Sequence, residues 1–89
     1  MEYEWDGRKA ASNLAKHGVG FETAMAVFSD ATRRTLLDVR RDYGEARLVT
    51  PGRVDGRVYV VAYTMRGGVV RIISARIANR REVAAHDAR

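Results

Sequence analysis

The stretch Val54–Ile77, VDGRVYVVAYTMRGGVVRIISARI, decides the fold. It contains two runs rich in β-branched and aromatic residues, Val58–Met65 and Val69–Ile77, of the kind that favours β-strands. Asp55–Gly56 precedes the first run and Gly67–Gly68 separates the two. Both dipeptides are typical of two-residue hairpin turns, because their residues tolerate positive φ. The stretch therefore predicts two consecutive β-hairpins and an antiparallel meander.

Two-residue turns also fix which residues face each other across the strands. Counting outward from the turns places Arg47 opposite Thr64, Thr64 opposite Arg71, and Glu45 opposite Arg66, all on one face. The next row on that face is predicted to hold Val49, Ala62 and Ile73. The opposite face is apolar, with predicted rows Ala46–Met65–Val70 and Leu48–Tyr63–Ile72. One sheet face should therefore be covered and the other should carry charge.

Two helices are expected before this meander. Asp6 is a good N-cap for a helix over residues 8–17, and Phe21–Phe28 has an apolar stripe at helical spacing. Their apolar sides should cover the apolar sheet face. Asn79 begins a short C-terminal helix, with Glu82 completing a capping-box pattern.

Three further segments read as strands: Tyr3–Trp5 as an edge strand, Thr35–Arg40, and Glu45–Val54 after an Asp42–Gly44 turn. The predicted order is β-α-α-β-β-β-β-α, an α+β fold. We expect an antiparallel four-stranded meander with two N-terminal helices on one face and a short C-terminal helix. The length of 89 residues leaves room for one domain, residues 1–89.

Charge and composition narrow the class of function. Sixteen basic residues outnumber eleven acidic ones, giving a net charge of +5. All but two of the basic residues are arginine, whose planar fork of donors matches phosphate oxygens. This favours a nucleic acid or an acidic protein as partner, although a GC-rich genome would also enrich arginine. Cysteine is absent, no apolar stretch is long enough to span a membrane, and no signal peptide is evident, so a cytoplasmic location is expected.

The charged face is the candidate site. Arg47, Arg66 and Arg71 are predicted to converge around Glu45, either to bind an anion or as an ordinary solvated face with cross-strand ion pairs. Arg76 lies an odd number of residues from Arg71, so an unbroken strand would point the two to opposite faces. Either Arg76 lies past the helix-covered region of the sheet, or a bulge near Ser74–Ala75 brings it round to the face of Arg71.

The sequence also resembles a known family along nearly its whole length. The N-terminal half carries Trp5-Asp6, Lys9, Asn13, Lys16-His17-Gly18-Val19, Phe21, Ala24 and Val27-Phe28; the C-terminal half carries Glu45, Arg47, Val60–Thr64, Arg71–Arg76 and Arg80–Glu82. This pattern is similar to the BrnT toxins. His86 and Gly7 depart from it, since relatives tend to have tyrosine and proline there.

The resemblance implies a RelE-like fold and cleavage of RNA that inhibits translation. It also implies a BrnA-like ribbon-helix-helix antitoxin as partner. Toxin and antitoxin would form a hetero-oligomer that binds operator DNA. Two other functions stay open at this point: a non-catalytic nucleic-acid-binding module, and an interaction protein for an acidic partner.

Metal-free RNA cleavage uses the 2′-hydroxyl to attack the adjacent phosphate, and we expect no metal and no cofactor. Arg47 and Arg71 are the expected phosphate clamps, and Glu45 would orient an arginine or act as a base. Further RNA contacts are expected from Lys16, Arg66, Arg76, Arg80 and Arg81. His17 is either a helix-capping residue or a proton carrier. His86 is either a proton donor or a solvated tail residue.

Overall fold

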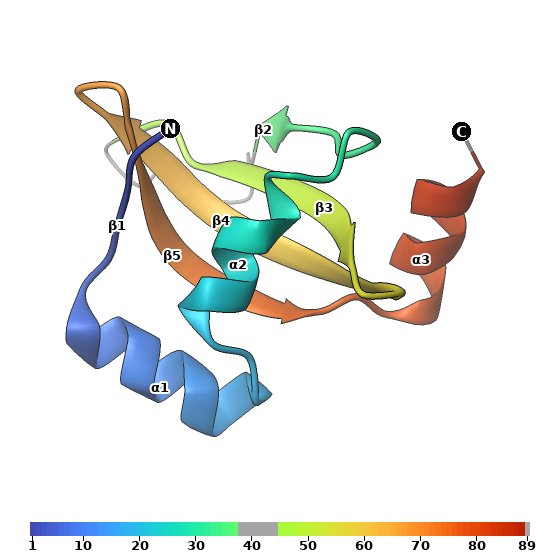
Figure 1. Cartoon of the computed structure of the whole chain (residues 1–89), viewed down its shortest axis with the longest axis horizontal. Helices are drawn as coiled ribbons and strands as arrows, with labels where there is room; N and C mark the ends of the chain where they lie inside the picture. The colour runs from blue at the N-terminus through green and yellow to red at the C-terminus, as the bar shows by residue number, and fades with distance from the viewer. Residues whose placement is uncertain (38–44, 89) are drawn as a thin grey trace.

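The computed structural model describes residues 1–37 and 45–88. The chain forms, in order, β1 (Tyr3–Glu4), α1 (Gly7–His17), α2 (Phe21–Val27), β2 (Leu36–Leu37), β3 (Leu48–Val54), β4 (Arg57–Arg66), β5 (Val69–Ile77) and α3 (Arg80–Asp87) (Figure 1). The predicted element order is confirmed. The predicted strand over Thr35–Arg40 is seen only as β2, and its last three residues, like the predicted turn at Asp42–Gly44, lie outside the described residues.

The sheet differs from the predicted four-stranded antiparallel meander. It has five strands in the order β1-β5-β4-β3-β2, and β1 pairs parallel with β5. The two-residue β1 places Tyr3 beside Val70 and Glu4 beside Arg71. The α+β class holds, but the sheet is mixed because the N-terminus returns alongside the last strand.

The two predicted hairpins form in the predicted register. Asp55 and Gly56 have φ of 49° and 82°, and Gly67 and Gly68 have φ of 57° and 80°, as two-residue turns matching the sheet twist require. Leu48 pairs with Tyr63 across β3 and β4, and each following pair keeps that register to the turn. Thr64 pairs with Arg71 across β4 and β5.

The predicted row Val49–Ala62–Ile73 is wrong at Ile73, because β5 has a bulge there. Tyr63 pairs with Ile72, but the next residue on β4, Ala62, pairs with Ser74, so Ile73 has no partner on β4. The extra residue shifts the face of everything after it. Arg76 pairs with Val60 and therefore lies on the same face as Arg71. The bulge thus explains how two arginines separated by an odd number of residues share one face.

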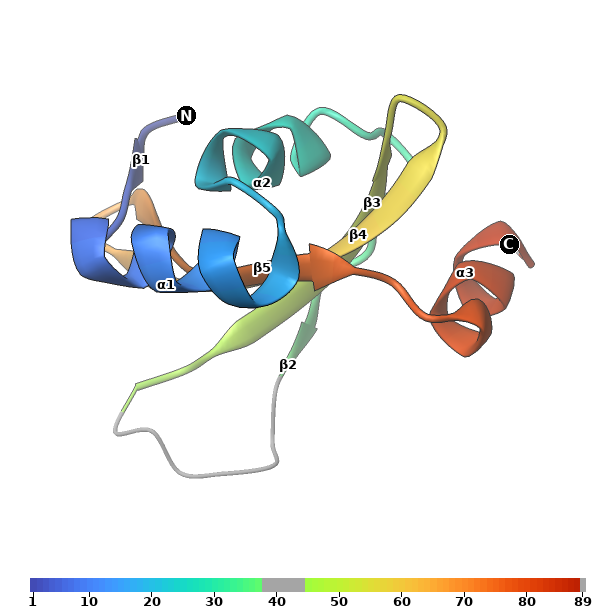
Figure 2. The same cartoon turned by 90° about the horizontal axis from the view of Figure 1, so that it is seen from below.

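The two sheet faces have different coverings. α1 and α2 lie together on one face (Figures 1 and 2), held by a core that includes Phe21, Ala24, Val27, Val61, Tyr63, Val70, Ile72 and Ala75. We call the other face, which carries Val58, Val60, Ala62, Thr64 and Arg66 of β4, the open face. α3 stands apart from α1 and α2 in both views and contacts β3. Its capping box, formed by Asn79 and Glu82, is present as predicted.

Candidate functional site

An arginine cluster occupies the open face beside the β4–β5 hairpin; it comprises Glu4, Glu45, Arg47, Arg66 and Arg71. Arg66 donates to both carboxylate oxygens of Glu45, with Nη2–Oε1 at 2.8 Å and Nε–Oε2 at 3.3 Å. Arg71 donates from Nη1 to the Glu4 carboxylate. Three strands, β1, β4 and β5, and the segment before β3 thus deliver charge to one patch, and the register count predicted all of these contributions except that of β1.

Arg47 reaches this patch although the β3–β4 ladder begins one residue later, at Leu48. The buried Thr64 hydroxyl donates to the Ala46 carbonyl at 2.7 Å and holds the preceding segment against β4. The pKa of Glu45 is lowered, first by the hydrogen bond from Arg66 and then by the charges of Arg66, Arg47 and Arg71. Arg47 and Arg71 therefore both act electrostatically on the same carboxylate.

Glu4 is a member of the cluster that sequence reasoning missed. Its partner Arg71 is far away in the chain, and only the parallel pairing of β1 with β5 brings the two side by side. A two-residue strand leaves no periodicity from which this pairing could be read. The cluster consequently has two carboxylates for its three arginines, and its net positive charge is smaller than the sequence suggested.

A second group of basic residues lies where β5 meets α3. Arg76 makes two hydrogen bonds to the Glu82 carboxylate, both at 2.7 Å, and these lower the pKa of Glu82. Arg80 and Arg81 are exposed in the first turn of α3. Because Val60 and Thr64 are four residues apart on β4, Arg76 lies about 13 Å along the strand from Arg71, at ~3.3 Å per residue.

His86 is buried, so its interpretation as a solvated tail residue is wrong. Its side chain is 3% exposed. Nε2 lies 3.3 Å from the Thr32 hydroxyl and 3.4 Å from the Asp30 carboxylate. The helical spacing of α3 turns this side chain inward, toward the turn that follows α2.

Asp30 organises that turn. Its carboxylate accepts from the Arg53 backbone N–H at 2.6 Å and from the Thr32 backbone N–H and hydroxyl at 2.8 and 2.7 Å. These bonds, led by the one from Arg53, lower the pKa of Asp30 to about 2 against the opposing effect of burial. Sequence reasoning singled out neither Asp30 nor Thr32, although an Asp-x-Thr turn is a recognisable local motif.

Lys16 and His17 are not brought to the arginine cluster. They lie with Lys9 in a shallow depression between α1 and β5, beside Ile73 and Ser74. The buried Asn13 closes this depression by bonding both the N–H and the carbonyl of Ala75, at 3.1 and 2.8 Å. His17 is partly exposed at the end of α1, so neither of its predicted roles is decided by its position.

The chemistry available on the open face is phosphate binding by fixed guanidinium groups. Within residues 1–37 and 45–88, no three His, Asp or Glu side chains gather closely enough to hold a metal ion. None of the helices in this described part is long and apolar enough to cross a membrane.

Comparison with known proteins identifies the family. A search of curated proteins found no match. Residues 5–82, which include α1, α2 and strands β2 to β5 but not β1, match the family described as the ribonuclease toxin BrnT of type II toxin-antitoxin systems. The match spans every member of the arginine cluster except Glu4, and it includes the bulge and the start of α3. The chain therefore belongs to the BrnT family of ribonuclease toxins.

Proposed function

We propose that this protein is a metal-independent endoribonuclease that binds the scissile phosphate at the arginine cluster. The observation that carries the proposal is the convergence of Arg47, Arg66 and Arg71 on one patch of the open face in a chain of a ribonuclease family. The substrate's 2′-hydroxyl would attack the adjacent phosphorus and expel the 5′-oxygen, leaving a 2′,3′-cyclic phosphate and a 5′-hydroxyl. Fixed arginines suit this reaction because negative charge builds on the phosphate oxygens in the transition state.

The ion pairs within the cluster do not prevent phosphate binding. The Arg71 side chain is 26% exposed and its partner Glu4 is 42% exposed, and ion pairs in contact with water contribute only about 0–1 kcal/mol. A guanidinium group has five N–H donors, and the bond to Glu4 uses Nη1 alone. A phosphate can therefore share or displace the carboxylates at small cost.

Glu45 fits a positioning role better than the role of a base. Its pKa is lowered by Arg66 and the neighbouring arginines, and a general base works best when its pKa lies near the working pH. Its two hydrogen bonds to Arg66 instead fix the direction of that guanidinium. His17 lies between α1 and β5, away from the cluster, and His86 is buried at the α3 end, so we assign proton transfer to neither histidine.

The biological role that we propose follows the family. RNA cleavage would inhibit translation in the cytoplasm, and a BrnA-like antitoxin would neutralise the protein in a hetero-oligomer that binds operator DNA. The net charge of +5 supports an acidic surface on that antitoxin, which would cover the open face.

The decisive experiment incubates the purified protein with a defined RNA in EDTA and maps the new ends. New 5′-hydroxyl and 2′,3′-cyclic phosphate ends are expected, and their yield should not change when the chelator is omitted. Salt-sensitive RNA binding without new ends would mean a non-catalytic binding module. No RNA binding at low salt would mean that the open face serves an acidic protein instead.

A further inference from the structure

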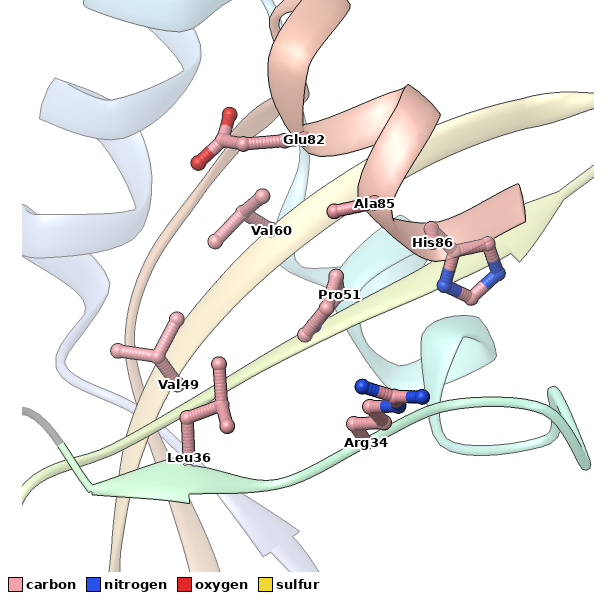
Figure 3. Close-up of a pocket in the computed structure, with 8 residues that line it drawn as sticks. All are labelled: Arg34, Leu36, Val49, Pro51, Val60, Glu82, Ala85 and His86. Atoms are coloured by element: carbon pink, nitrogen blue, oxygen red, sulfur yellow. The ribbon is translucent and has the colours of Figure 1, made fainter. Parts of the chain in front are cut away.

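A pocket of about 170 Å³ lies on the open face where α3 meets β2, β3 and β4 (Figure 3). Its walls are mainly apolar and come from Leu36, Val49, Pro51 and Val60, and Glu82 also lines it. A cavity of about 150 Å³ with apolar walls accommodates a benzene ring. The pocket is therefore the right size for one aromatic ring and is shaped by residues from four separate elements.

Two polar groups at the pocket have unused hydrogen-bonding capacity. The Nδ1 atom of His86 is buried and has no hydrogen-bond partner among residues 1–37 and 45–88, while the opposite ring nitrogen contacts Thr32 and Asp30. The ring of His86 stands at one end of the pocket, with the Arg34 side chain nearby (Figure 3). Within the same described residues, the Arg34 guanidinium forms neither a hydrogen bond nor an ion pair. A buried polar atom without a partner calls for a ligand or another explanation.

The pocket is continuous with the proposed RNA-binding face. Val60 forms part of its wall and pairs with Arg76 across β4 and β5. Arg71 of the arginine cluster pairs with Thr64, which lies about 13 Å further along the same strand than Val60. An RNA strand bound there would bring its next bases to the pocket.

We propose that this pocket binds one nucleobase of the RNA strand and so gives the enzyme a base preference. A nucleobase combines an aromatic ring for the apolar walls with a hydrogen-bonding edge for His86, and its phosphate suits Arg34. The proposal rests on the proposed function for the identity of the strand. It adds a residue set, away from the arginine cluster, that selects sequence rather than performing cleavage.

Two neighbouring alanines on α3 provide a matched pair of variants. Ala85 lines the pocket, whereas Ala84 is absent from its lining, and both are exposed. Ala85→Leu fills the pocket without overpacking a core, and Ala84→Leu adds the same side chain to the adjacent position. Thermal melts of both variants should match the wild type.

The experiment measures binding of 2′-fluoro oligonucleotides, which lack the attacking hydroxyl and stay intact. Fluorescence anisotropy compares four oligonucleotides, each containing only one kind of base, with an abasic strand of equal length. The wild type should bind at least one of the four about tenfold more tightly than the abasic strand, as expected for one accommodated base. Ala85→Leu should lose that preference, and Ala84→Leu should keep it.

The following outcomes overturn the pocket's assignment. The first is a base preference that Ala85→Leu leaves intact. The second is that Ala85→Leu weakens binding of the abasic strand as much as binding of the preferred oligonucleotide. The third is an unchanged base preference together with lost antitoxin binding, which would show that a protein side chain occupies the pocket. Tight abasic binding without any base preference refutes the pocket alone, whereas no binding of any strand refutes the proposed function as well.

Discussion

At the hairpin end of the open face, Arg71 and Glu4 pair while remaining 26% and 42% exposed; at the α3 end, His86 and Asp30 meet while only 3% and 10% exposed. The first pair is in contact with water and can exchange its partner for a phosphate at small cost. The second is desolvated, and removing either member leaves a buried polar group without a partner. The same face therefore has one end suited to binding anions and one suited to holding α3 in place.

The largest expected effect is at the exposed end. Arg71→Ala should lower the rate of RNA cleavage by about 10²–10³, because one fixed donor to the developing charge is lost. The melting temperature should change little, since the pair with Glu4 is exposed. Single-turnover cleavage and circular dichroism melts measure the two quantities. Arg57→Ala, at an exposed position next to the β3–β4 turn, is the control, and equal rates for the two variants would remove Arg71 from the site.

The next effect tests the buried end. Asp30→Ala removes the acceptor of three hydrogen bonds and leaves His86 beside an unfilled space. We expect a loss of about 2–3 kcal/mol in the free energy of unfolding, or about 10 °C or more in melting temperature for a domain of this size. Below that temperature, cleavage should persist.

Asp87→Ala is the matched control for this loss. Asp87 pairs with Arg53 at the same end of α3, but both side chains are well exposed, so the cost should stay below about 1 kcal/mol. Equal destabilisation by the two variants would show that burial of Asp30 is not what anchors α3.

Sequence reasoning predicted the parts of this arrangement that follow from local rules. Tight turns at Asp55–Gly56 and Gly67–Gly68 set the register, and the register alone predicts that Arg66 lies against Glu45. The bulge at Ile73 was anticipated in kind, through the odd spacing of Arg71 and Arg76, but only the structure locates it.

The contacts that the sequence did not predict share a physical cause: each joins segments that are far apart in the chain. Glu4 joins Arg71 through a two-residue parallel strand, and His86 meets Asp30 because α3 packs back toward the turn after α2. Neither pairing leaves a periodic signal in the sequence, since each depends on where a helix or terminus docks. The charge balance of the cluster and the burial of His86 were therefore beyond a sequence-only interpretation.

Acidification provides a second test of the buried end, through the pKa of Asp30. The pKa of Asp30 is lowered from 3.8 to about 2 in the folded protein, so the unfolded chain takes up this proton first as the pH falls. Stability from this group is present above about pH 5 and is lost as the pH falls toward 2, amounting to about 2 kcal/mol. Urea unfolding across this range should show a steeper loss for the wild type than for Asp30→Ala. Parallel curves for the two proteins would contradict the buried, hydrogen-bonded state of this carboxylate.

The smallest expected effect separates the two roles considered for Glu45. Glu45→Gln removes a charge from an exposed pair, so stability should change by less than about 1 kcal/mol. If the carboxylate only positions Arg66, cleavage should stay within a few-fold of the wild type, and RNA should bind slightly more tightly because a competing anion is gone. A general base would instead lower the rate by about 10²–10⁴ when neutralised. Single-turnover rates at saturating RNA decide between these outcomes, and a loss of the larger size would assign proton abstraction to Glu45.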